Sequence, residues 1–154
     1  MMRSVLFITL LGGLLSACGP ELPEYPPEPA ITFVRFAQPG DSLQVTVHFT
    51  DGDGDLGVPE ENPTPNMYFY FYHRNPAGQW VPTEGPDPLA VDTFIYPYRV
   101  PELPTSQKKV MEGEITVTME KMFLPHDTLR MDIRLYDRAG HPSNKITTPE
   151  LILH

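Results

Sequence analysis

The sequence predicts an all-β fold, an antiparallel β-sandwich of about seven strands. Apolar and polar residues alternate with a period of two in several short segments that are rich in aromatic and β-branched residues. Turn-forming Gly, Pro, Asn and Asp separate these segments at near-regular spacing. Beyond residue 18, no segment of about 11 residues or longer repeats apolar side chains with the period of an amphipathic helix. Together these observations favour two packed sheets.

The expected strands follow one another along the chain at residues 31–36, 42–50, 66–73, 79–81, 114–120, 129–135 and 145–153. In the longer strands one face is apolar, which predicts these core residues: Leu43, Val45, Val47, Phe49, Met67, Phe69, Phe71, Ile115, Val117, Met119, Leu129, Met131, Ile133 and Leu135. Polar residues on the opposite face of 42–50 predict that this strand is buried on one side only. Six prolines interrupt residues 82–110, so only an edge strand is expected there, at 89–96.

The N-terminus has the pattern of a secretory signal. One basic residue, Arg3, precedes an apolar run over residues 5–15 that is far shorter than the roughly 20 residues of a membrane-spanning helix. The run ends in Leu-Ser-Ala-Cys, where Cys18 is the single cysteine of the chain. This segment resembles bacterial lipoprotein signals, which implies cleavage of residues 1–17 and acylation of Cys18, with three acyl chains anchoring the protein in a membrane. An ordinary secretory signal with a stray cysteine is the alternative.

A short proline-rich segment separates the predicted lipid anchor from the predicted domain. Residues 19–29 contain five prolines and three glutamates, so we expect residues 18–29 to form an extended, semi-rigid tether and residues 30–154 to form the sandwich. Gly19 stands where inner-membrane lipoproteins carry aspartate, so the resemblance implies the outer membrane. Whether the domain faces the periplasm or the outside stays open.

The composition restricts the partners. Loss of Arg3 with the signal leaves 10 of the 11 Lys and Arg residues against 20 Asp and Glu, a net charge of −10. Such a balance argues against nucleic acid and anionic lipid, because both would be repelled. It leaves carboxylates available for cations. Acylation of Cys18 also removes the last thiol, so no disulfide stabilises the domain.

Two segments around the strand at 129–135 carry a family resemblance. Residues 124–127 (LPHD) and 137–144 (DRAGHPSN) are similar to the last hairpin of immunoglobulin-like and fibronectin type III-like domains, with His141 where asparagine is usual. The Cys–Trp–Cys core of antibody domains is absent, so the resemblance is to the cysteine-free relatives. The lipoprotein signal, the tether and the segment DGDGDLG together resemble small lipoproteins of Bacteroidota.

An aspartate- and glycine-rich segment follows the second expected strand. In DGDGDLG, Asp51, Asp53 and Asp55 alternate with glycines, which lets three hard oxygen ligands turn toward one Ca²⁺ ion. The spacing resembles the first half of an EF-hand loop, but Leu56 replaces its turn glycine and Asn62 replaces its bidentate glutamate; Glu60 or Glu61 is the candidate to complete the site. The alternative is a solvated loop of Asp-Gly turns. If calcium binds, a structural role is expected.

The second candidate site is the polar face of residues 66–73. Tyr68, Tyr70 and Tyr72 form a platform suited to sugar rings or to a partner protein of the envelope. The alternative is that aromatic residues occur there only because they are good strand formers. Trp80 either joins this platform or fills the core.

No catalytic motif is present in the sequence. Nucleophile-elbow, zinc-protease, phosphate-loop and dinucleotide motifs are all absent, and the five histidines show no metal-ligand spacing. Asp132, between Arg130 and Arg134, has the pattern of an ordinary charged face. The sequence therefore predicts a non-catalytic, lipid-anchored envelope protein that presents a sandwich as an accessory or binding module. A glycan-binding module is the first alternative, and a hydrolase with an unrecognised site is the second.

Overall fold

The computed structural model describes residues 23–85, 93–102, 110–121 and 126–154. These residues form nine strands and no α-helix: β1 (Ala30–Ala37), β2 (Ser42–Asp51), β3 (Met67–Arg74), β4 (Trp80–Pro82), β5 (Ile95–Tyr98), β6 (Met111–Glu120), β7 (Thr128–Leu135), β8 (Ile146–Thr147) and β9 (Leu151–Ile152). None of them belongs to a helix of the length and apolarity that crossing a bilayer requires. The predicted signal, Cys18 and the start of the tether lie outside the described residues, as do parts of the segments at 89–96 and 124–127.

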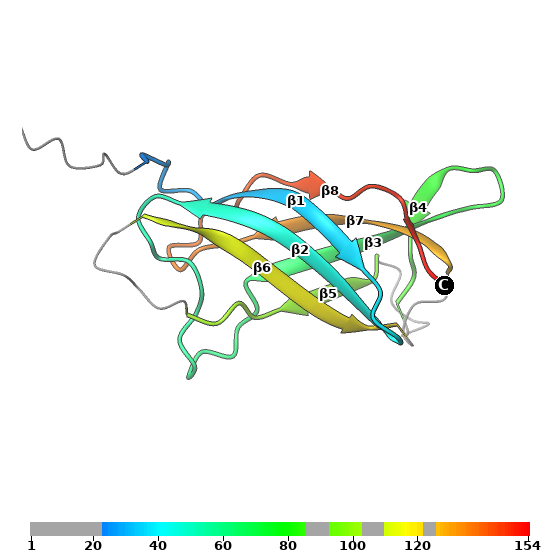
Figure 1. Cartoon of the computed structure of the whole chain (residues 1–154), viewed down its shortest axis with the longest axis horizontal. Coiled ribbons are helices and arrows are strands. Elements are labelled where there is room, and N and C mark those ends of the chain that lie inside the picture. Colours follow the sequence, from blue (N-terminus) through cyan, green and yellow to red (C-terminus); the bar gives the residue numbers. More distant parts are fainter. Residues whose placement is uncertain (1–22, 86–92, 103–109, 122–125) are drawn as a thin grey trace, which may run out of the picture.

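The strands form two antiparallel sheets that pack face to face, as an open β-sandwich (Figure 1). One sheet has the order β1-β2-β6, with β2 in the centre. The other is centred on the long pair β3-β7: β4 and β5 pair with the far edge of β3, and β8 and β9 pair with the far edge of β7. The predicted all-β class and antiparallel sandwich are confirmed.

Alternating apolar residues from both sheets form one core. Every core residue predicted from the alternation is buried, and the cluster also includes Ile31, Leu56, Val100, Met111, Leu151 and Leu153. The expectation that β2 is buried on one side only is wrong at Thr46, which is fully buried on the outer face. Its neighbours on β1 and β6 cover it, and its hydroxyl lies 2.9 Å from that of Thr116. A buried hydroxyl is tolerated because this hydrogen bond satisfies it.

The strand count exceeds the seven predicted because two expected segments differ from their predicted form. The last strand is divided into β8 and β9 near Pro149, which has no N–H for the ladder. Thr148 keeps the contact with β7, since its N–H donates to the Met131 carbonyl (2.8 Å) and its Oγ1 accepts from the Met131 N–H (2.9 Å). The proline-rich region contributes β5, whose bounds lie later than the predicted 89–96 and include Pro97.

Two contacts connect the start of the domain to distant segments. The Asn144 side chain acts as a peptide group toward Ile31: its Oδ1 accepts from the Ile31 N–H (2.8 Å) and its Nδ2 donates to the Ile31 carbonyl (2.9 Å). The Pro26 carbonyl accepts from the N–H of Gly52, in the loop after β2 (2.9 Å). A Cβ at Gly52 would lie 2.1 Å from the Tyr25 carbonyl oxygen, so this approach requires glycine.

Candidate functional site

The end of β2 and the loop after it bring three carboxylates together. Asp51 is the last residue of β2, and Gly54 and Gly57 take positive φ angles of 73° and 85° that turn the chain back on itself. As a result, oxygen atoms of Asp51, Asp53 and Asp55 all lie within 4.8 Å of one another. We refer to these three residues as the aspartate cluster.

Two oxygens of this cluster are buried and have no hydrogen-bond partner among the residues that the structure describes. Asp51 is fully buried; its Oδ2 accepts from the Leu56 N–H (3.0 Å), whereas its Oδ1 has no partner among the described residues. Asp55 is similar, with Oδ2 accepting from the Ala139 N–H (3.1 Å) and Oδ1 unpartnered. Burial, together with the negative charges of the neighbouring carboxylates, raises the pKa of Asp51 to about 6, although the Leu56 hydrogen bond acts in the opposite direction. Burial also raises the pKa of Asp55.

A fourth aspartate, Asp137 in the turn after β7, lies close enough to the cluster for its charge to act on Asp51 and Asp55. Asp137 is buried, and its negative charge raises the pKa values of Asp51 and Asp55. Its own oxygens are occupied by His141, through the backbone N–H (2.7 Å) and through Nδ1 (2.9 Å). Asp137 is distant from the aspartate-rich segment along the chain, so the local spacing of aspartates does not predict it here. The glutamates proposed to complete the site, Glu60 and Glu61, are exposed and are not in the carboxylate group.

This arrangement has the donor chemistry that Ca²⁺ requires. Three carboxylates converge, two of their oxygens have no other partner in the described part of the chain, and burial makes each unneutralised charge unfavourable. A divalent cation bound by these oxygens would remove the mutual repulsion. Asp51, Asp53 and Asp55 therefore fit a hard cation, with Asp137 acting through its charge.

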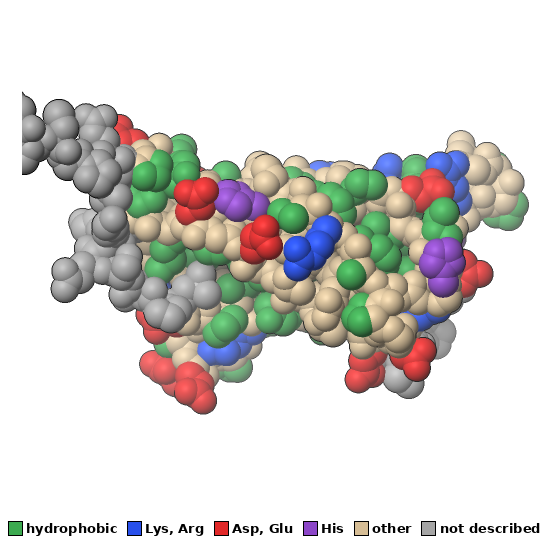
Figure 2. Space-filling model, in the orientation of Figure 1, with side chains coloured by type: hydrophobic (Ala, Val, Ile, Leu, Met, Phe, Trp, Pro, Cys, Tyr) green, Lys and Arg blue, Asp and Glu red, His purple; other side chains and the backbone are tan. Residues whose placement is uncertain are grey.

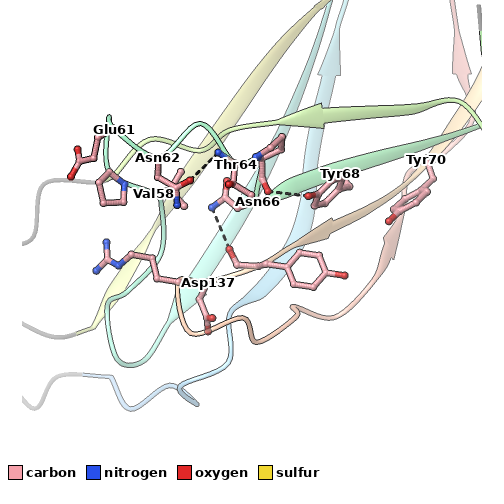
Figure 3. A pocket seen from close by; sticks show the side chains of 12 residues that line it. Val58, Glu61, Asn62, Thr64, Asn66, Tyr68, Tyr70 and Asp137 are labelled. Carbon is pink, nitrogen blue, oxygen red and sulfur yellow. Dashed lines mark hydrogen bonds between the residues drawn. The ribbon is translucent and has the colours of Figure 1, made fainter.

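The tyrosines of β3 lie on the outer face of the larger sheet. Tyr68, Tyr70 and Tyr72 are half-buried, and they alternate with core residues of the same strand. Tyr68 and Tyr70 line a cavity of about 740 Å³ (Figure 3). Its remaining lining comes from the loop after β2 and from the turn after β7: Val58, Pro59, Glu61, Asn62, Thr64, Pro65, Asn66, Tyr136, Asp137 and Arg138. The rings of Tyr68 and Tyr136 meet edge to face at 5.9 Å.

The wall of this cavity is held by side-chain hydrogen bonds. The Arg99 guanidinium donates to the carbonyl oxygens of Val58, Pro59 and Asn62, at 2.5–3.1 Å. The Asn66 side chain accepts from the Val100 N–H (2.8 Å) and donates to the Tyr136 carbonyl (3.3 Å; Figure 3). The loop after β2 is therefore hydrogen-bonded to the segments that follow β5 and β7, although it is not itself a strand of the sheet.

A smaller hollow of about 200 Å³ continues along the same face. Tyr70 lines both spaces, and Tyr72, Asp132, Arg134 and Lys145 complete the second. The prediction that Asp132 belongs to an ordinary charged face is wrong, because its carboxylate is buried. It accepts from Lys145 (2.8 Å) and from the Thr147 hydroxyl (2.6 Å). Burial opposes ionisation of Asp132, but these hydrogen bonds outweigh it and hold the pKa below its usual value.

Trp80 lies on this outer face and is absent from the buried core. Of the two positions expected for it, the structure therefore shows the one beside the tyrosines. The Arg130 guanidinium lies 4.9 Å from the Trp80 ring centroid and 5.4 Å from that of Tyr72. Arg74 covers Trp80 at 5.0 Å and pairs with Glu150 at 2.7 Å. The aromatic platform is thus interleaved with arginines.

The outer face of the three-stranded sheet is chemically different. It presents threonines and glutamates of β2 and β6, with an ion pair between Arg35 and Glu114 (4.0 Å) and a hydrogen bond between His48 Nε2 and Glu112 (3.2 Å). Near the middle of this face, acidic, histidine and basic side chains lie next to one another in a short row of mixed charge (Figure 2). On the larger sheet, His73 and His126 stack at 3.7 Å, and burial lowers the pKa of His73.

Comparisons with known proteins assign no family. No protein-family model matches the chain, and no curated protein matches it. Among solved structures, wild-type OgpA from Akkermansia muciniphila aligns over 89% of this chain at 14% identity and a TM-score of 0.38. The chain spans about a third of the length of that protein, since the match covers 33% of it. The structure itself defines the class, an all-β domain of two antiparallel sheets.

Proposed function

We propose that this chain is a non-catalytic, lipid-anchored protein of the cell envelope whose immunoglobulin-like sandwich is a calcium-stabilised accessory or binding module. The lipoprotein-type signal ending at Cys18 and the proline-rich tether support the anchoring, and their resemblance to known lipoproteins favours the outer membrane. The turn at 137–144 supports the immunoglobulin-like or fibronectin type III-like assignment, because Asn144 of this turn hydrogen-bonds to the start of β1.

The observation that carries the proposal is the pair of buried, unpartnered oxygens in the aspartate cluster. Buried polar atoms in folded proteins nearly always have a partner, and an unpartnered carboxylate oxygen is more unfavourable than a neutral group. Asp51 Oδ1 and Asp55 Oδ1 belong to the same converging group. A bound Ca²⁺ would satisfy both oxygens and would fix the loop that crosses from β2 to β3.

Thermal melting in EDTA and in 10 mM calcium tests this proposal. Extracellular calcium modules bind with a Kd of about 10⁻⁴–10⁻³ M, which corresponds to a stabilisation of about 1.4–2.7 kcal/mol at this concentration. Asp53→Asn should abolish the gain without disturbing the fold, since Asp53 is exposed. Asp41→Asn removes an equal charge from an exposed turn outside the cluster and should keep the gain. Equal melting temperatures with and without calcium would leave the loop as a set of Asp-Gly turns.

The anchor has an independent test. Wild-type protein should partition into the detergent phase and take up labelled fatty acid, and Cys18→Ser should do neither. Release of the wild type into the aqueous phase, without label, would support the ordinary secretory signal.

A glycan-binding module is the second candidate, favoured by the cavity that Tyr68 and Tyr70 line. Aromatic faces bind the apolar C–H face of sugar rings, and the amides and hydroxyls around them accept and donate hydrogen bonds. Replacement of Tyr68, Tyr70 and Tyr72 by alanine should then abolish binding on a glycan array. An unchanged array profile would remove this candidate.

A further inference from the structure

The two spaces on the outer face of the larger sheet form one continuous surface. We call it the tyrosine groove and define it by these residues: Tyr68, Tyr70, Tyr72, Tyr136, Asp132, Arg134 and Lys145. Antiparallel register places Arg134 opposite Tyr68, and Asp132 opposite Tyr70. Because directly opposed residues share a face, the charged side chains of β7 lie beside the rings of β3. At about 3.4 Å per residue, successive tyrosines stand about 7 Å apart along the strand.

The smaller hollow of the groove is locally positive in an otherwise acidic protein. The chain has a net charge of −9, and the Lys145 charge is matched by Asp132. Arg134 forms no ion pair with any residue that the structure describes, and its Nε is buried without a hydrogen-bond partner. The same holds for Arg130, which stacks on Tyr72 and Trp80. Charges elsewhere on the chain are screened within about 8 Å in physiological salt, so Arg134 determines which ligand charge is favoured here.

The larger cavity of the groove is polar and contains carboxylates. Asp137 is bound by His141, Arg138 pairs with Glu102 at 3.0 Å, and Glu61 is exposed at the rim. This cavity therefore favours neutral hydroxyl groups, which Asn62, Thr64 and the Tyr68 ring can contact (Figure 3). The groove thus has a cationic hollow and a neutral polar cavity side by side, and Tyr70 lines both.

The position of the groove argues against an extended peptide as its ligand. A peptide that adds to a sheet requires an open strand edge, but β3 and β7 are both paired on their two sides. The groove offers side chains alone. Flat aromatic rings beside a guanidinium are suited to a ring-shaped ligand with many hydroxyls and an anionic substituent.

We propose that the tyrosine groove binds an acidic oligosaccharide, with sugar rings on Tyr68, Tyr70 and Tyr72 and a carboxylate or sulfate group at Arg134. Lys145, already paired with Asp132, lines the same hollow as Arg134 and adds a second donor. This inference rests on the proposed function, in which the sandwich is a binding module.

Calorimetric titration of the full chain in detergent tests the ligand class. The probes are oligogalacturonate, oligoalginate, and chondroitin sulfate and heparin fragments, each beside a neutral counterpart, such as methyl-esterified oligogalacturonate with the same backbone. At least one acidic probe should bind at least tenfold more tightly than its neutral counterpart, with a Kd that rises with salt. Carboxylated and sulfated probes distinguish the two sources of the negative charge.

Matched variants localise the interaction. Arg134→Gln should weaken binding at least tenfold and Tyr70→Ala should abolish it, whereas Arg35→Gln, on the other sheet, should leave Kd unchanged. All variants should keep the wild-type melting temperature within a few degrees. Equal binding of acidic and neutral probes, unaffected by Arg134→Gln, would overturn the acidic class but leave a glycan-binding module. If no probe binds the folded protein, the inference is wrong, while the calcium experiment still decides the proposed function independently.

Discussion

The Asp51→Asn substitution tests two effects of the aspartate cluster separately. One is the destabilisation that the buried Asp51 charge causes without metal, and the other is the proposed stabilisation by bound calcium. In the metal-free protein the pKa of Asp51 is about 6, against a usual value of 3.8. A raised carboxyl pKa means that the folded state holds the proton more tightly than the unfolded state. The folded state is therefore favoured at low pH, and stability is lost as pH rises from 3.8 through about 6.

The magnitude follows from that interval. At about 1.4 kcal/mol per pH unit, the ionised side chain lowers the free energy of unfolding by at most about 3 kcal/mol at neutral pH. Exposed Asp53 leaves the cluster accessible to water, and solvent screening reduces the expected value to about 1–2 kcal/mol. Asparagine keeps an oxygen for the Leu56 N–H and removes the charge.

The assay is thermal or urea unfolding in EDTA at several pH values between 4 and 8, repeated with calcium. In EDTA at pH 7, Asp51→Asn should melt about 4–8 °C higher than wild type, taking about 4 °C for each kcal/mol. The difference should vanish near pH 4, and the variant should lose the calcium-dependent gain. Asp41→Asn is the charge-matched control. A variant that is destabilised equally at every pH in EDTA would refute the reasoning, since the charge would then not be the unfavourable element.

Three further outcomes follow from described contacts. Phe69→Ala should lower the free energy of unfolding by about 3–5 kcal/mol in urea titrations, because Phe69 is fully buried between the sheets; a loss under 1 kcal/mol would contradict this packing. Arg99→Met should weaken ligand binding in the tyrosine groove while lowering stability by only about 1–3 kcal/mol, because its hydrogen bonds hold the loop and not the core; unchanged ligand binding would show that the loop does not shape the groove. In NMR titrations His141 should have a pKa above 6.5 and His73 one below it, since Asp137 favours the charged His141 ring and burial disfavours the charged His73 ring. The His141 contribution to stability is then full below pH 6.5 and is lost as pH rises through its folded pKa. The reverse order of the two pKa values would refute these assignments.

The strands were predictable wherever one face is buried. Alternation in β2, β3, β6 and β7 gave bounds within a few residues of the structure, because a shift of one residue would move every apolar side chain out of the core. The division near Pro149 was less visible, since Thr148 replaces a ladder bond with its hydroxyl. The number of strands at this end of the chain therefore depends on Pro149 and Thr148, and the alternation of apolar and polar residues does not predict it.

The residues of the candidate sites were predictable from the sequence only where they lie close together along the chain. Asp51, Asp53 and Asp55 are found in one short segment, and β3 carries its tyrosines in alternation. Asp137 and Lys145 come from other segments, so only the pairing of β7 with its neighbours brings them to these sites. The sequence predicted an ordinary surface charge at Asp132. Its partners Lys145 and Thr147 come from a later segment, and the residues around Asp132 do not indicate that contact.

The contacts at the start of the domain have a mechanical consequence. A pull on the N-terminal segment first loads the hydrogen bond from the Tyr25 hydroxyl to Glu112, in β6 of the three-stranded sheet, and the one between Gly52 and Pro26, in the loop after β2 of the same sheet. It then meets the two bonds between Ile31 and Asn144, which lies just before β8 of the other sheet. Tension is therefore divided between both sheets before it reaches the ladder of β1 and β2, which would otherwise open one bond at a time. We therefore expect the fold to resist force applied from its N-terminal end, which is where the proposed membrane anchor would pull.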